Sequence, residues 1–224
     1  MSTDSGPTSR SDLPSVDRLL TLTDGVVAIA LTLLVLQLKV PPLADVTDPN
    51  SASALASELG KGGDQLISYV ISFYVIAQFW LVHYRVFRQV AGQQEGLAWW
   101  NFAFLFTITV MPFTSSLLGE YSSNPLAVDI FAVNLLLASL ATQATLIFGH
   151  RKGLVVERSG PESLFAGRMR LLANTLVIAL SIGVAWKSTG AAKYCWLLLA
   201  LAPRVADFLT VRRERARSRA QGRG

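Results

Sequence analysis

The chain has 224 residues and a formal net charge of +5, and 51% of its residues are hydrophobic while 16% are charged. Because an average soluble domain has roughly 25% charged residues, this composition disfavours a soluble domain and favours a protein of the lipid bilayer. The single cysteine, Cys195, excludes an intrachain disulfide and any metal site built on several thiolates. The basic residues lie between and after the apolar segments, which disfavours nucleic acid as a partner.

Residues 1–15 are mostly polar and predict a disordered tail. Six apolar segments follow, each about as long as a helix that crosses a bilayer. They lie at residues 16–40, 65–87, 97–118, 125–149, 167–186 and 191–211. We therefore predict an all-α membrane protein with one domain of six transmembrane helices at residues 16–211, followed by a basic tail at residues 212–224.

The distribution of basic residues predicts the orientation of these helices. If both termini are cytoplasmic, all but four of the 20 lysines and arginines lie on the cytoplasmic side, and the exceptions are Lys39, Lys61, Lys187 and Lys193. This split follows the positive-inside rule and supports the count of six independently of hydropathy. The arginines of the C-terminal tail are expected to attract anionic lipid.

The residue pattern disfavours an enzyme. The two histidines, His83 and His150, are far apart in the sequence, and no nucleophile elbow, zinc-binding HExxH motif, P-loop or dinucleotide fingerprint occurs. We therefore predict no catalytic residues, no metal site and no cofactor.

The first apolar segment is unusual because Asp24 lies about one turn inside it. A charged group within a membrane helix is costly and usually faces protein or water. Arg18 is six residues earlier, roughly 240° around the helix, so it is not an i,i+4 partner of Asp24. Asp24 is therefore expected to find a partner on another helix, either as a structural polar cluster or as part of a gate.

The same segment carries an apolar stripe. Ile29, Leu33 and Leu36 are spaced i, i+4, i+7, with Thr32 beside them, and Asp24 lies about 140° away from Ile29. Such a stripe is typical of ordinary helix packing. It also fits a narrow pore, because hydrophobic constrictions gate by dewetting when several copies surround an axis. The spacing leaves both interpretations open.

Three motifs carry a family resemblance. The first reads Arg18-x-x-x-Leu22-Thr23-Asp24, the second is Phe-Trp-Leu-Val-His-Tyr-Arg-x-Phe at residues 79–87, and the third, within residues 100–113, contains Trp-Asn and Met-Pro-Phe. Together they resemble the endosomal and lysosomal potassium channel family (transmembrane protein 175) in its bacterial branch, whose signature is Arg-x-x-x-Phe-Ser-Asp. Thr23 keeps the hydroxyl of the family's Ser, whereas Leu22 lacks the aromatic ring of its Phe.

The resemblance implies a potassium-selective homotetramer in the bacterial inner membrane, with the first helix of each chain lining the pore and no canonical selectivity filter. It implies a hydrophobic constriction at Ile29, Leu33 and Leu36, with Thr32 favouring potassium, the permeant ion. It also implies a polar brace within each subunit, in which Thr23 and Asp24 bond to His83 and Asn101, and to which Arg18 contributes.

Two other functions remain open at this stage. One is a secondary transporter, or a proton-conducting channel or carrier, that uses Asp24 and His83 as a relay. The other is a membrane scaffold or lipid-binding subunit that transports nothing.

Overall fold

The computed structural model describes residues 15–42, 46, 48, 50–90, 94–154 and 161–196. Within these ranges the helices are α1 (Val16–Val35), α2 (Ala52–Lys61), α3 (Gly63–Phe87), α4 (Glu95–Glu120), α5 (Pro125–Arg151) and α6 (Pro161–Ala185). Residues 189–196 are also helical.

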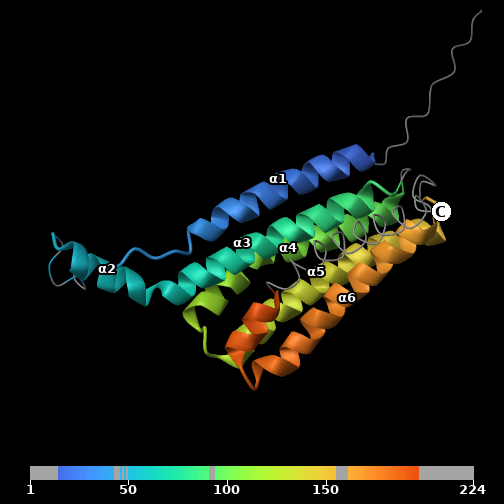
Figure 1. Ribbon diagram of the computed structural model, residues 1–224. Helices are drawn as coiled ribbons and strands as arrows, with labels where there is room; N and C mark the ends of the chain where they lie inside the picture. Colours follow the sequence, from blue (N-terminus) through green and yellow to red (C-terminus); the bar gives the residue numbers. More distant parts are fainter. Residues whose placement is uncertain are drawn as a thin grey trace, which may run out of the picture.

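The long helices pack side by side as a layered bundle (Figure 1). The α1 helix lies on one side of this bundle and packs against α3 and α4. The α5 helix packs against α4 and α3, and α6 packs against α5 on the opposite side of the bundle. The short helix α2 projects from the end of the bundle at which α3 begins.

Several helices begin where the sequence supplies a cap. The α1 helix begins after Ser15, whose side chain accepts from the backbone N–H of Arg18 at 3.4 Å. The α5 helix begins after Asn124, whose side chain accepts from Leu126 N at 2.9 Å, and its first residue is Pro125. Proline suits this position because its fixed backbone angle is helical and its missing N–H would have no partner in the helix.

Four of the described helices, α1, α3, α4 and α5, are long and apolar enough to cross a membrane. They coincide with the first four predicted segments. The fifth segment falls on α6, in which Leu171–Ala185 is the apolar stretch within the fully described part of the chain. The sixth segment, residues 191–211, continues beyond residue 196 and lies mostly outside the described residues, as do both predicted tails.

Two details differ from the sequence-based expectation. The first helix ends at Val35, with Leu36 as its C-cap, and does not continue to residue 40. Beyond this point the polar side chains bind the C-terminal half of α4: Gln37 donates to the Pro112 carbonyl, and Lys39 pairs with Glu120 at the end of the helix.

The second difference is α2, which hydropathy did not reveal because the helix is short and lacks a long apolar run. It begins after Ser51, which accepts from Ala54 N at 3.4 Å. None of its residues is buried.

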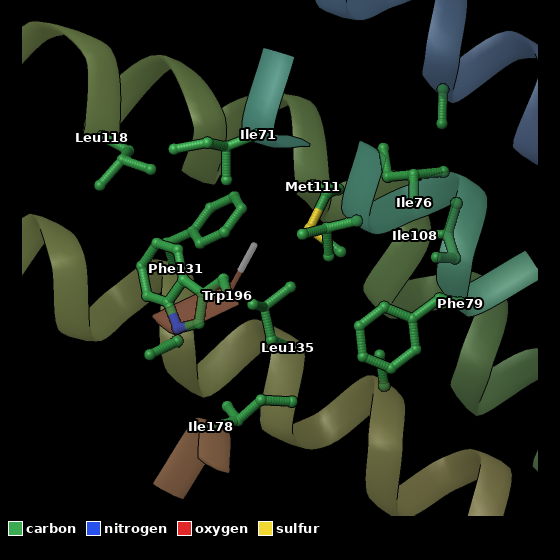
Figure 2. Packing of buried hydrophobic residues seen from close by; sticks show 14 of the residues in the cluster. Ile71, Ile76, Phe79, Ile108, Met111, Leu118, Phe131, Leu135, Ile178 and Trp196 are labelled. Carbon is green, nitrogen blue, oxygen red and sulfur yellow. The ribbon is translucent and has the colours of Figure 1, made fainter. Parts of the chain in front are cut away.

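The core joins α1, α3, α4, α5, α6 and the helical residues near 196. Figure 2 shows Phe131 of α5 beside the indole of Trp196, and Leu135 of α5 between Trp196 and Met111 of α4. Polar side chains also join the helices. The Ser72 hydroxyl donates to Ser115 at 2.7 Å, and Asn134 Nδ2 donates to the Thr107 carbonyl at 3.0 Å. Such close packing and interhelical hydrogen bonds are the forces that hold helices together in lipid.

Candidate functional site

The α1 helix has a buried face and an exposed face. Its buried residues follow one side of the helix against α3 and α4, and they are Leu19, Thr23, Val27, Ala30 and Leu34. The predicted stripe lies away from this side, because Ile29, Leu33 and Leu36 are 60%, 43% and 76% exposed. The structure therefore places all three residues on the outer surface of a helix that is itself on the outside of the bundle.

The centre of the exposed face consists of small and hydroxyl-bearing residues. Thr32 is nine residues after Thr23, which is half a turn around the helix at 100° per residue. Thr21, Gly25 and Ala28 share this exposed side, and a methyl group at Gly25 would meet nothing within 4 Å. The Thr32 hydroxyl donates to the Ile29 carbonyl at 2.8 Å. Its oxygen lone pairs therefore remain available to accept from water or to contact a cation.

Thr23 joins α1 to α4 on the opposite, buried face. Its hydroxyl oxygen lies 2.9 Å from the Leu19 carbonyl oxygen and 3.0 Å from Oδ1 of Asn101. Thr23 is 1% exposed and Asn101 is fully buried. The two acceptors share the single hydrogen of the hydroxyl, so this group links the backbone of α1 to a side chain of α4.

His83 lies on α3 beside this link. Its ring is fully buried and is stacked between Phe87 and Phe104, with centroid distances of 4.4 and 4.2 Å. The Asn101 amide lies next to the ring. However, neither ring nitrogen of His83 nor Nδ2 of Asn101 has a hydrogen-bond partner within the described part of the chain. The ring is therefore held mainly by its two aromatic neighbours.

Asp24 binds a different partner from the one expected. Its Oδ1 accepts a hydrogen bond from Trp80 Nε1 at 2.7 Å, and the expected bond to His83 is absent from the described hydrogen bonds of both ring nitrogens. The reason is geometric. Asp24 is rotated by about 100° from Thr23, toward the solvent-exposed edge of the contact with α3, whereas the His83 ring lies on the buried side.

The Trp80 indole was not predicted as a site residue, although its position three residues before His83 on one helix was a usable signal.

Arg18 lies apart from these groups. It is exposed in the first turn of α1, and its backbone N–H is the group that binds Ser15. Among the described residues its guanidinium group has no hydrogen-bond or ion-pair partner. The structure therefore brings Thr23, Asn101 and His83 together. Asp24 lies beside this group and is bonded to Trp80, whereas Arg18 is not part of it.

This arrangement fixes which side of α1 faces outward. The link from Thr23 to Asn101 and the bond from Trp80 to Asp24 hold α1 to two different helices, so the helix cannot rotate about its axis without breaking one of them. The exposed face with Thr32 and the apolar stripe is consequently held outward.

The described residues contain no group of three His, Cys, Asp or Glu side chains that could hold a metal ion.

Comparison with known proteins identifies relatives of this chain. A family model described as the endosomal/lysosomal potassium channel TMEM175 matches residues 18–112. A Streptomyces collinus protein named as a potassium channel is 30% identical over 170 residues, which cover 74% of this chain and 80% of that protein. A human protein named as the endosomal/lysosomal proton channel TMEM175 is 29% identical over 102 residues, covering 43% of this chain and 20% of the human protein.

A solved structure has a similar fold. It is the crystal structure of a lysosomal potassium-selective channel TMEM175 homolog from Chamaesiphon minutus, with a TM-score of 0.74 and 23% sequence identity. The similarity covers 85% of this chain and 97% of that chain. At this identity the match concerns the arrangement of the helices.

Proposed function

Because the chain belongs to the endosomal/lysosomal potassium channel TMEM175 family, we propose that it forms a potassium-preferring channel. The chain is a multi-pass membrane protein of the same fold as its bacterial relative. In the proposed channel, four copies surround a central axis, and α1 of each copy lines the pore. Conduction is passive and involves no enzymatic step and no cofactor.

The observation that carries this proposal is the exposed apolar stripe on α1. The buried polar link holds α1 to the bundle and at the same time fixes the rotation of this helix about its axis. Here the link directs Ile29, Leu33 and Leu36 away from the rest of the chain. Four such faces around an axis form rings of bulky apolar side chains, which narrow a pore and gate it by dewetting.

Thr32 supplies the proposed preference for potassium. It lies between Ile29 and Leu33 in the sequence, and its hydroxyl hydrogen is donated to the carbonyl of its own helix. A ring of four such hydroxyl oxygens presents acceptors to a permeant cation at the level of the constriction. Oxygen ligands of this kind replace part of the hydration shell of potassium in the absence of a canonical carbonyl filter.

The proposed membrane orientation follows the arginines. Both termini are cytoplasmic in a bacterial inner membrane, with six spans per chain and the basic residues of the C-terminal tail attracted to anionic lipid.

The substitution Ile29→Asn tests the pore assignment. Placed in the constriction, the amide is expected to hydrate the pore, to raise the potassium flux of reconstituted liposomes several-fold and to lower its preference over sodium. Leu176→Asn is the matched control, because Leu176 of α6 is also a branched apolar residue that is 60% exposed. Unchanged conduction and selectivity in Ile29→Asn would refute α1 as the pore-lining helix.

A second candidate function is proton conduction or proton-coupled transport through Asp24 and His83. It is favoured by the name of the human relative, a proton channel, and by the buried His83 ring whose nitrogens have no partner among the described residues. Asp24 and His83 are not bonded to each other, so this function needs water or a rearrangement between them. Flux that saturates, requires a proton gradient and lacks single-channel steps would favour it over passive potassium conduction.

A further inference from the structure

A groove lies between α4 and α5, and residues from the first half of α4 and the second half of α5 line it. Its volume is about 590 Å³, within the range of roughly 300–1,000 Å³ that is typical of small-molecule sites. Its walls are formed by large apolar side chains that flank small ones: Trp100, Ala103 and Phe106 from α4, and Leu140, Ala144 and Ile147 from α5. The alanines create the hollow because they leave the space between the larger side chains empty.

The polar side chains near the groove are bonded elsewhere. Gln143 contributes to the lining, but its Nε2 donates to Thr175 of α6 at 2.5 Å. The Thr107 hydroxyl donates to the Phe104 carbonyl at 2.6 Å. The groove therefore presents almost entirely hydrocarbon, which suits a lipid chain better than a polar ligand.

The length of the groove matches one leaflet of a bilayer. On α5 it extends from Leu137 to Ile147, which is about 15 Å along the helix axis at 1.5 Å per residue. This is half of a hydrocarbon core of about 30 Å. Because α4 and α5 both have the length and composition of membrane spans, the groove lies in the part of the chain that is suited to the hydrocarbon core.

A basic group stands at the end of the groove. Arg151 is exposed and lies four residues after Ile147, so it continues the same face of α5 by one turn beyond the groove. Lys152 follows it, and Trp100 is 40% exposed at the corresponding end of α4. The guanidinium group of arginine matches a phosphate with two parallel hydrogen bonds, and tryptophan is favoured at the membrane interface. Glu95 in the first turn of α4 and His150 in the last turn of α5 are the other titratable side chains of these two turns.

We propose that this groove binds an anionic phospholipid, whose acyl chain lies between α4 and α5 and whose phosphate is held by Arg151. The occupant is a lipid of the leaflet at which α5 ends. This site is distinct from the C-terminal basic tail and does not depend on which ion the channel conducts. Bound phospholipid explains why an apolar hollow and an exposed arginine lie on the same face of α5. A helix surface that only contacts bulk lipid requires neither feature.

The test is lipid retention by the full-length protein. The protein is reconstituted in nanodiscs with equal amounts of dioleoyl phosphatidylglycerol and dioleoyl phosphatidylcholine, and the lipids that remain bound are counted by native mass spectrometry. The wild type is expected to retain phosphatidylglycerol in preference. Arg151→Gln is expected to reduce that preference about fivefold, the factor that corresponds to about 1 kcal/mol per basic residue near an anionic surface. Ala144→Phe fills the hollow and is expected to reduce retention of both lipids.

Arg88→Gln is the matched control, because Arg88 is also exposed at the end of a membrane helix, but that helix is α3, which contributes no residue to the groove. An equal effect of Arg88→Gln and Arg151→Gln would overturn the proposal in favour of general surface charge. An unchanged preference in Arg151→Gln, which alters only a surface side chain and should fold, would also overturn it. So would oxidative cross-linking of Ala144→Cys between copies in a Cys195→Ser background, since a second subunit would then occupy the groove.

Discussion

The link between α1 and α4 predicts unequal effects for two threonines on the same helix. Thr23→Val and Thr21→Val each replace a hydroxyl by a methyl of similar size on α1. Each hydroxyl lies 2.9 Å from a carbonyl oxygen four residues earlier. They differ because Thr23 is buried and also contacts Asn101, whereas Thr21 is exposed. The pair therefore separates the interhelical bond from any change in the helix itself.

The expected cost follows from the groups that lose partners. Interhelical hydrogen bonds in membrane proteins contribute about 0.6 kcal/mol on average and up to about 1.7. Removal of the Thr23 hydroxyl also leaves the fully buried Asn101 amide without its partner, and an unsatisfied buried polar group costs about 1–3 kcal/mol. These two figures describe overlapping contributions, so Thr23→Val should destabilise the chain by about 1–3 kcal/mol. Thr21→Val should change stability by less than about 0.5 kcal/mol, as surface substitutions do.

The measurement is the midpoint of unfolding of the purified protein in detergent, by heat or by a denaturing surfactant. For a chain of this size about 1 kcal/mol corresponds to a shift of about 2–4 °C in the midpoint. Thr23→Val should therefore unfold at a temperature several degrees lower, while Thr21→Val stays near the wild type. The outcome does not depend on which way the Asn101 amide is turned, since either of its polar atoms loses the hydroxyl. Equal midpoints for the two variants would refute the structural role of the link.

Three further predictions concern the surroundings of this link. Gly119→Ala should destabilise the chain by about 1–3 kcal/mol, because the added methyl would lie 3.2 Å from the Gln65 Cα and α3 must shift. Gly25→Ala should instead stabilise the chain by up to about 1 kcal/mol, since the new methyl meets open space and alanine favours the helix. Unfolding midpoints that move in the same direction for Gly119→Ala and Gly25→Ala would contradict this reasoning. The effects of Trp80→Phe and Asp24→Asn on the free energy of unfolding should not be additive, and a double-mutant cycle should give a coupling of about 1 kcal/mol. Strict additivity would show that the hydrogen bond between the two side chains contributes nothing.

The sequence was sufficient for the position of three long helices. Apolar length and proline positions predicted α3, α4 and α5 to within a few residues of their observed ends. These features are local, because a run of about 20 apolar residues forms a helix in a bilayer whatever its neighbours are. The same reasoning missed α2, whose ten residues are amphipathic and too few for a hydropathy signal. It also extended α1 beyond Val35, because Gln37 and Lys39 bind α4 only in the folded chain.

For the candidate site, helical periodicity alone placed Asp24 and the apolar stripe on different sides of α1. In the structure Ile29, Leu33 and Leu36 are exposed, and Asp24 is exposed at the edge of the contact with α3, where it binds Trp80. The identity of the partners depends on how α1 is rotated against α3 and α4, which no local pattern specifies. The expected bond from Asp24 to His83 was wrong for this reason, because His83 and Trp80 are on the same helix but at different heights and angles.

The sequence by itself therefore determined the class of this protein, its long apolar helices and the division of α1 into a polar and an apolar side, since each follows from composition or from a period of 3.6 residues. Only the tertiary structure decided that the apolar stripe faces outward, that Trp80 holds Asp24, and that two alanines leave a groove beside Arg151. These features arise where side chains from different helices meet. Contacts of this kind depend on the mutual rotation and height of whole helices rather than on any one segment.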